Sequence, residues 1–191
     1  AKLLHDDIHE FFSRREWYAQ MGIPWRRGHL FYGPPGTGKT SAAYALAGEL
    51  RLKLCAISLT NPKLNDNVMA DLLQRTPPRS LILLEDIDAF FNAREKQDTR
   101  IQVSFSGLLN ALDGVAAQEG RIVVLTTNHR DKPDPALIRP GRIDMAVELG
   151  NADASQLKGL LLRFYPDAGA KADALVASYP AGSLSPAQIQ Q

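Results

Sequence analysis

Short apolar runs and stretches of helical periodicity alternate along most of the chain. The apolar runs predict strands over residues 29–32, 54–59, 81–84, 121–127 and 145–149. Apolar positions that recur every three or four residues predict helices over residues 3–20, 39–50, 68–75 and 101–112. Strands that alternate with helices favour a parallel sheet covered by helices on both faces. We therefore expect an α/β fold.

The pattern changes after Gly150, where helical periodicity continues but no further strand is predicted. Helices are expected over residues 153–164 and 168–178, and a third begins near Ser185. We predict a domain boundary near residue 150. Residues 1–150 would form the α/β domain, and residues 151–191 the start of a small all-α domain.

Composition narrows the class of protein. The chain has 191 residues, of which 45% are hydrophobic and 23% charged, as is usual for a globular protein. Its only cysteine, Cys55, excludes a disulfide framework and multi-cysteine zinc sites. The 22 basic and 21 acidic residues give a net charge of +1, so we expect no nucleic-acid partner. The chain starts without Met and contains no apolar run of membrane-spanning length, and we expect a piece of a longer protein.

Residues 33–40 read Gly-Pro-Pro-Gly-Thr-Gly-Lys-Thr, between an expected strand and an expected helix. They fit the phosphate-binding loop (P-loop) pattern G-x-x-x-x-G-K-[ST] of nucleoside triphosphatases. Glycines let backbone N–H groups surround phosphate oxygens, while Lys39 reaches the phosphates and Thr40 ligates Mg²⁺. A glycine-rich turn with an incidental lysine fits this context less well. The expected nucleotide-binding residues are Gly33, Pro34, Pro35, Gly36, Thr37, Gly38, Lys39, Thr40 and Ser41.

Polar side chains follow two of the expected strands. Glu85 and Asp86 come after the strand at 81–84, and Asn128 follows the strand at 121–127. Ligands of open α/β proteins bind at the carboxyl ends of strands, where a carboxylate can hold Mg²⁺ or activate water. Solvated acids and a turn asparagine are the alternatives. The phosphate loop favours the functional interpretation.

Residues 134–144 read Asp-Pro-Ala-Leu-Ile-Arg-Pro-Gly-Arg-Ile-Asp and place Arg139 and Arg142 three positions apart. Two surface arginines would be unremarkable alone. Together with the phosphate loop, the acidic pair followed by Ile-Asp-Ala, and Thr-Thr-Asn at 126–128, the chain resembles an AAA ATPase of the AAA+ superfamily. The resemblance runs from about Met21 to Asp144.

The resemblance implies a P-loop NTPase core followed by a helical lid, ATP and Mg²⁺ as ligands, and a homo-oligomeric ring. It also implies that Arg139 and Arg142 reach into a neighbour's ATP site. Most AAA members read Asp-Glu where this chain reads Glu85-Asp86. The resemblance therefore gives Glu85, with Thr40, the Mg²⁺ role and Asp86 the catalytic role, although the two could be reversed.

Further motifs resemble one branch, the mitochondrial AAA translocases that assemble the cytochrome bc complex by moving its folded Rieske iron–sulfur protein across the inner membrane. They include Gly-Ile-Pro-Trp-Arg-Arg-Gly at 22–28, Phe-Ser-Gly-Leu-Leu-Asn-Ala-Leu-Asp-Gly at 105–114 and Ser-Pro-Ala-Gln at 185–188. The branch implies attachment to the inner membrane through segments outside this chain, with the ATPase on the matrix side. Bacterial relatives would instead be cytoplasmic.

The segment Thr60–Asn67 has neither the aromatic residue nor the glycine with which AAA unfoldases grip an extended chain, which favours a folded protein cargo. Two other functions stay open: a DNA-linked AAA+ loader, and a scaffold that binds ATP but barely hydrolyses it. Trp17, Tyr18 and Trp25 either pack near the adenine or belong to the core.

Overall fold

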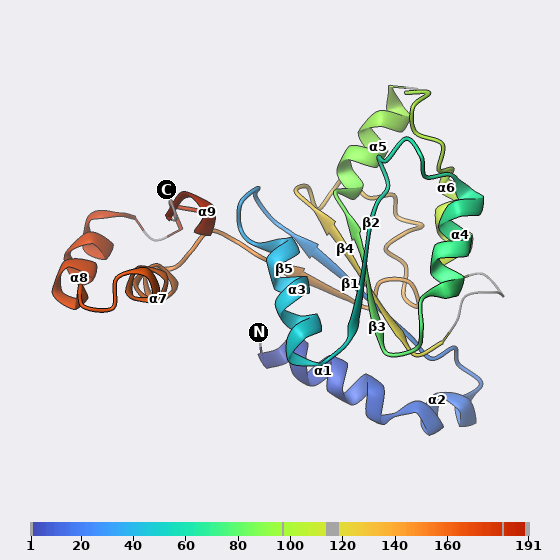
Figure 1. Ribbon diagram of the computed structural model, residues 1–191, viewed down its shortest axis with the longest axis horizontal. Coiled ribbons are helices and arrows are strands. Elements are labelled where there is room, and N and C mark those ends of the chain that lie inside the picture. The colour runs from blue at the N-terminus through green and yellow to red at the C-terminus, as the bar shows by residue number, and fades with distance from the viewer. Residues whose placement is uncertain (1, 97, 114–118, 181, 190–191) are drawn as a thin grey trace.

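The fold is built on one sheet of five parallel strands in the order β2-β3-β4-β1-β5 (Figure 1). The computed structural model describes residues 2–96, 98–113, 119–180 and 182–189. The strands are β1 (Arg26–Tyr32), β2 (Lys53–Ser58), β3 (Ser80–Glu85), β4 (Arg121–Thr127) and β5 (Met145–Glu148). All five expected strands are therefore present, and the α/β fold class is confirmed.

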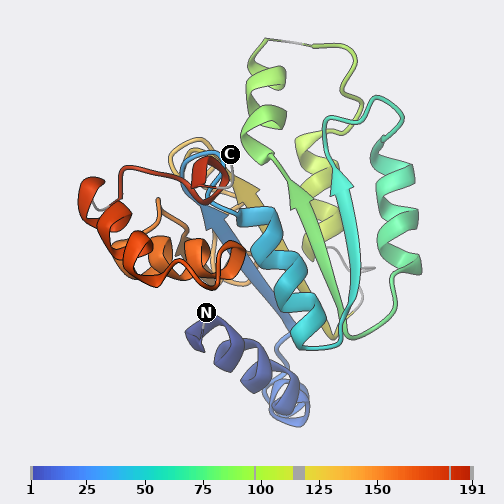
Figure 2. The ribbon, with the colours of Figure 1, turned by 60° about the vertical axis from the view of Figure 1, so that its left-hand side comes forward.

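Helices cover both faces of the sheet, as Figure 2 shows. Helices α1 (Lys2–Ser13) and α3 (Lys39–Glu49) pack on one face, and α4 (Asp66–Arg75), α5 (Ile87–Glu95) and α6 (Phe105–Asp113) pack on the other. Successive residues of a strand point to opposite faces. Leu81 and Leu83 accordingly join the cluster under α1 and α3, whereas Ile82 and Leu84 join the cluster under α4, α5 and α6.

The helix expected over residues 3–20 is two helices, α1 and α2 (Arg15–Met21), and that expectation is wrong in this respect. At the break, the Phe11 carbonyl oxygen accepts from the Arg14 N–H at 3.3 Å, as in a turn. The indole Nε1 of Trp25 donates to the Phe11 carbonyl oxygen at 3.0 Å. In an unbroken helix that carbonyl would accept from the N–H four residues later.

Two helices on the other face also depart from expectation. α5 was not predicted, and α6 begins at Phe105 rather than at residue 101. Ser104 sets the start of α6, because its Oγ accepts from the Gly107 N–H at 2.8 Å as an N-cap does. Before it, Gln102 forms an isolated bridge with Asn65 instead of a helical turn.

Among the described residues, three helices follow the sheet: α7 (Ala154–Phe164), α8 (Gly169–Ser178) and α9 (Pro186–Ile189). A capping box between Asp153 and Gln156 starts α7. Figure 1 shows these helices beside the sheet, joined to β5 by an extended segment. The expected helices are thus present, while the division into two domains at residue 150 stays a prediction. None of the helices in the described ranges is long and apolar enough to cross a membrane.

Candidate functional site

The phosphate loop connects β1 to α3 at the carboxyl edge of the sheet. Its glycines Gly33, Gly36 and Gly38 have φ values of 139°, 79° and 90°, a region that favours glycine. A Cβ at Gly33 would also lie 2.1 Å from the Leu149 carbonyl oxygen. Gly38 is the N-cap of α3, so the N-terminus of that helix points its N–H groups into the loop.

Lys39 is buried inside this loop, with 7% of its surface exposed. Its ammonium donates to the carbonyl oxygens of Gly33 and Pro34, both at 2.8 Å. Burial lowers the pKa of Lys39, against the opposing effect of the nearby Asp86 and Asp88 carboxylates. The ammonium is therefore held at the centre of the loop, where phosphate oxygens would meet it.

Thr40 joins the phosphate loop to the end of β3. Its hydroxyl donates to Glu85 Oε1 at 3.0 Å. The described residues hold no group of three or more His, Cys, Asp or Glu side chains that could bind a metal ion alone. Mg²⁺ at nucleotide sites instead takes one or two protein oxygens together with phosphate oxygens and waters. The hydroxyl and carboxylate oxygens of Thr40 and Glu85 fit that requirement.

Asp86 and Asn128 come together at the ends of the neighbouring strands β3 and β4. Asp86 has left-handed backbone angles, φ 50° and ψ 51°, and its N–H donates to Thr126 Oγ1 at 3.1 Å. Asn128 donates to Asp88, a buried residue of α5 that the sequence patterns did not single out.

A cavity of about 460 Å³ lies over these groups. Its described lining is Pro35, Gly36, Gly38, Lys39, Thr40, Ser41, Asp86, Asn128, Pro186 and Ala187. Pro186 also lines a neighbouring cavity of about 750 Å³, between Thr37, β5 and α7. Volumes of this order suit a nucleotide. The sequence patterns missed α9 as part of the site, where Ala187 N–H donates to Gly36 O at 3.1 Å.

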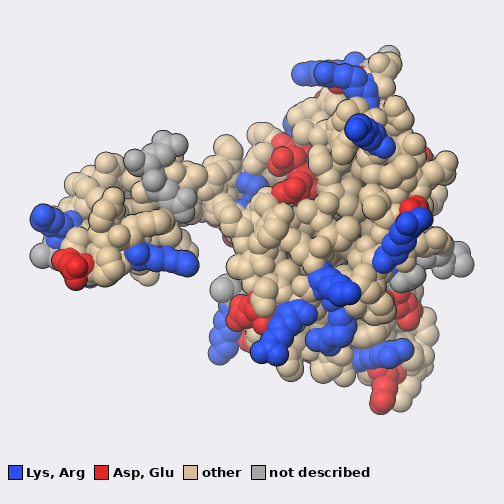
Figure 3. Space-filling model, viewed as in Figure 1, with Lys and Arg blue, Asp and Glu red and all other residues tan. Residues whose placement is uncertain are grey.

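Acidic side chains gather near the end of β4, with basic side chains beside them and over α5, whereas Lys and Arg predominate around the opposite end of the sheet (Figures 1 and 3). A triphosphate brought to this acidic group meets like charge. Lys39 and a divalent cation would have to offset that repulsion.

The two arginines lie outside this cavity among the residues described. Arg139 is exposed. Arg142 is half-buried and donates to the Ala136 carbonyl oxygen within its own loop. The structure of one chain thus gathers Lys39, Thr40, Glu85, Asp86 and Asn128 but not the arginines.

A profile of the ATPase family associated with various cellular activities (AAA) matches residues 29–151. The chain belongs to the AAA family. It is similar to the probable mitochondrial chaperone bcs1 of Schizosaccharomyces pombe, with 48% identity over 177 residues that cover 91% of this chain and 39% of the relative. Mitochondrial chaperone BCS1 of Homo sapiens is 46% identical over 197 residues, covering 96% of this chain and 46% of the relative.

The relatives extend beyond mitochondrial chaperones. An AAA-ATPase of Arabidopsis thaliana is 39% identical over 169 residues, which cover 83% of this chain and 37% of that protein. This AAA chain spans less than half the length of the three curated relatives it is compared with here.

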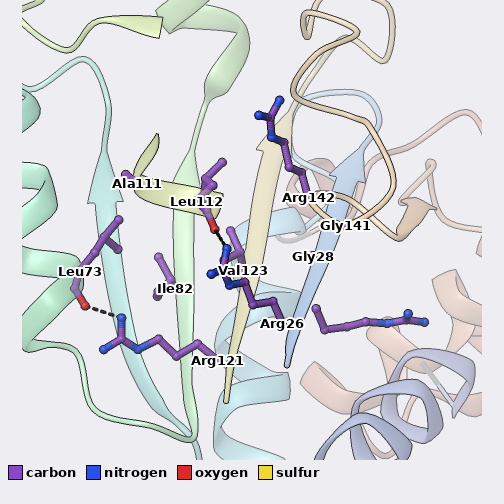
Figure 4. Close-up of a pocket in the computed structure, with 11 residues that line it drawn as sticks. Arg26, Gly28, Leu73, Ile82, Ala111, Leu112, Arg121, Val123, Gly141 and Arg142 are labelled. Atoms are coloured by element: carbon purple, nitrogen blue, oxygen red, sulfur yellow. Dashed lines mark hydrogen bonds between the residues drawn. The ribbon is translucent and has the colours of Figure 1, made fainter. Parts of the chain in front are cut away.

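A further cavity of this AAA chain, at the amino ends of β1 and β4, is too small for a nucleotide (Figure 4). It measures about 30 Å³, which suits a water molecule or two. Arg121 donates to the Leu73 carbonyl oxygen, and Arg26 donates to that of Leu112 at 3.4 Å. These arginines therefore satisfy carbonyls at the carboxyl ends of α4 and α6.

The aromatic residues before the phosphate loop pack together away from the two large cavities. The rings of Trp25 and Phe11 stack with centroids 5.4 Å apart, and Tyr18 meets Phe11 edge to face at 5.8 Å. Neither Trp25 nor Tyr18 appears in the described lining of those cavities. For Tyr18 and Trp25 the structure supports core packing, whereas Trp17 is exposed and fits neither interpretation.

Proposed function

We propose that this AAA chain hydrolyses ATP as one subunit of a ring-shaped chaperone that moves a protein cargo. The observation that carries the proposal is the hydrogen bond from Thr40 to Glu85, with Lys39, Asp86 and Asn128 around the same cavity. This bond joins a phosphate-binding loop to an acidic strand end. The acidic strand end places carboxylates beside the bound phosphates, and hydrolysis needs such groups to hold Mg²⁺ and to activate water.

The residues divide the work as follows. Backbone N–H groups of the phosphate loop and the Lys39 ammonium bind the phosphates. Thr40 and Glu85 would hold Mg²⁺, which would neutralise part of the phosphate charge. Asp86, which lines the cavity, orients the attacking water and takes its proton, and the Asn128 amide helps to place that water.

The ring completes the site. A guanidinium supplied by a neighbouring subunit stabilises charge on the phosphate being transferred. Arg139 is exposed on a loop outside its own cavity, which supports such a role. Arg142 stands three residues further on the same loop and is assigned to the neighbour's site as well.

The names of the relatives support the place of action in this proposal. Two of them are named mitochondrial chaperones, which supports a mitochondrial protein. We assign the inner membrane, with the ATPase facing the matrix, and a folded cargo of the kind moved during cytochrome bc complex assembly. The loop before α4 supports a folded cargo, because residues 60–67 include no aromatic side chain that could grip an extended chain. In this loop Leu64 is buried and Asn65 caps the helix.

The test measures steady-state ATP turnover of the purified protein over a range of protein concentrations. A ring motor gains specific activity as it assembles, and Lys39→Ala abolishes both turnover and nucleotide binding. Lys53→Ala removes an exposed lysine of β2 and keeps both. Tight ATP binding with negligible turnover at every concentration would contradict the motor and support a scaffold.

A further inference from the structure

Asp88 is a buried carboxylate in the first turn of α5, with 7% of its surface exposed. Both of its oxygens are bonded to Asn128. Oδ1 accepts from the Asn128 backbone N–H at 3.2 Å, and Oδ2 accepts from the side-chain Nδ2 at 3.4 Å. Asp88 is absent from the described lining of the phosphate cavity, whereas Asn128 is part of it.

An ionised carboxylate can only accept hydrogen bonds, whereas an amide both donates and accepts. The contact with Asp88 therefore decides which way the Asn128 amide faces. Its nitrogen turns toward Asp88, and its Oδ1 is the acceptor left for the cavity. A neutral partner that could also donate would allow the opposite orientation.

Other contacts keep Asp88 in place. The adjoining turn is fastened to β4 by the Asp86 N–H, which donates to Thr126 Oγ1 at 3.1 Å. The N-terminus of α5 favours a negative charge in its first turn, which offsets part of the cost of burying the carboxylate. Both hydrogen bonds of Asp88 thus go to one neighbour, Asn128.

We propose that Asp88 is a positioning residue that holds the Asn128 amide with its Oδ1 toward the water that attacks ATP. The inference rests on the proposed ATP hydrolysis and assigns one more residue to that reaction. Asp88 itself touches neither nucleotide nor water. It acts through the orientation of one amide.

The variant that tests this is Asp88→Asn, which keeps the size of the side chain but adds an N–H donor. That donor faces one of the two Asn128 donors, so the amide turns or moves away. We expect kcat to fall roughly 10- to 100-fold, as is usual when an outer partner of a site residue is lost. KM for ATP should stay the same or fall, because a negative charge near Lys39 is removed.

A double-mutant cycle separates this role from a structural one. Asn128→Ala alone should also lower kcat, and adding Asp88→Asn to it should lower kcat no further, because the residue through which Asp88 acts is gone. Asp71→Asn on α4, an exposed aspartate that pairs with Arg75, serves as the control and should match wild type. If Asp88→Asn does not assemble, Asp88→Ser takes its place in the cycle.

The kinetics of these variants decide whether Asp88 acts through Asn128. Losses that multiply in the double variant, or a raised KM, would mean that Asp88 acts on something other than Asn128. Wild-type kcat in Asp88→Asn beside a slow Asn128→Ala would overturn the Asp88 role and leave the proposed function standing. A wild-type protein that does not turn over ATP at all would overturn both.

Discussion

Glu85 and Asp86 differ by one methylene group, and they face different partners. Glu85 accepts the Thr40 hydroxyl, whereas Asp86 lines the cavity from a left-handed backbone position. Most AAA proteins carry the shorter acid first. In this chain the longer side chain reaches Thr40 from the strand end, and the left-handed turn directs the shorter one to the cavity. This geometry supports the assignment of Mg²⁺ to Glu85 and catalysis to Asp86.

Asp86→Asn should leave ATP bound but slow its hydrolysis by a hundredfold or more, the scale of losing a general base. Glu85→Gln should instead raise the Mg²⁺ concentration needed for half-maximal turnover. Titrations of Mg²⁺ and ATP on both variants check this. A slow Glu85→Gln with a normal Mg²⁺ requirement, beside an active Asp86→Asn, would reverse the two roles.

The candidate site could be predicted in part from the sequence. Lys39, Glu85 and Asn128 follow directly from strand ends and the phosphate-loop spacing, because parallel strands end at one edge. Asp88, Pro186 and Ala187 could not be recognised as its neighbours in that way. The direction of Asp88 depends on how α5 leaves β3, and Ala187 meets Gly36 only through tertiary folding.

The charge of Asp7 on α1 should affect the stability of the protein. Burial raises the pKa of Asp7, but hydrogen bonds from His29 and Arg27 outweigh it and lower the pKa from 3.8 to about 2. A lowered pKa in the folded state stabilises the protein above the unfolded pKa, and this contribution is lost as the pH falls from about 4 toward 2.

Asp7→Asn should therefore lower the free energy of unfolding at neutral pH by about 2 kcal/mol. The difference from wild type should shrink below about pH 4. Urea unfolding at several pH values measures it, with Asp6→Asn, an exposed neighbour on the same helix, as the control. A difference that stays constant down to pH 2 would mean that packing, not charge, is what Asp7 contributes.

At the scale of elements, strands could be predicted more reliably than helix boundaries. The apolar run at 81–84 is buried on both faces and admits few other interpretations. α5 was missed because it follows β3 directly, with only Asp86 between them and no glycine or proline to mark the turn. At the break between α1 and α2, Trp25 donates to the Phe11 carbonyl oxygen, and this contact arises only in the fold, so the periodicity of residues 3–20 does not show it.

Trp25→Phe tests how much this hydrogen bond contributes to stability. It keeps an aromatic ring at this position but removes the N–H that donates to the Phe11 carbonyl, so we expect a loss of about 1–2 kcal/mol of unfolding free energy. Trp17→Phe is the matched control, because Trp17 is 43% exposed, and it should change stability by less than about 0.5 kcal/mol. Equal effects of the two substitutions would remove the hydrogen bond as the explanation.

At the scale of the whole molecule, one chain brings Lys39, Asp86 and Asn128 to one cavity, whereas Arg139 and Arg142 are outside its described lining. The phosphate loop, the ends of β3 and β4, and α9 enclose the cavity. Arg139 is exposed and is not part of the described lining of this cavity. It lies on a loop that contains Pro133, Pro135 and Pro140. Arg142 donates to the Ala136 carbonyl oxygen of that same loop, and in the proposed ring this contact would hold the loop that carries Arg139.

Arg139→Ala should bind ATP almost normally and hydrolyse it very slowly, because a guanidinium from a neighbour contributes roughly 10³- to 10⁵-fold in rate. Lys132→Ala, which removes an exposed lysine on the preceding turn, is the control and should keep wild-type turnover.

Mixing Arg139→Ala with Lys39→Ala should restore part of the activity, since some interfaces then pair an intact Lys39 with an intact Arg139. Mixed assembly is first established with two different affinity tags, and turnover is then measured. Mixed rings no more active than either parent would count against a role in the neighbour's site, and full turnover by Arg139→Ala alone would end it.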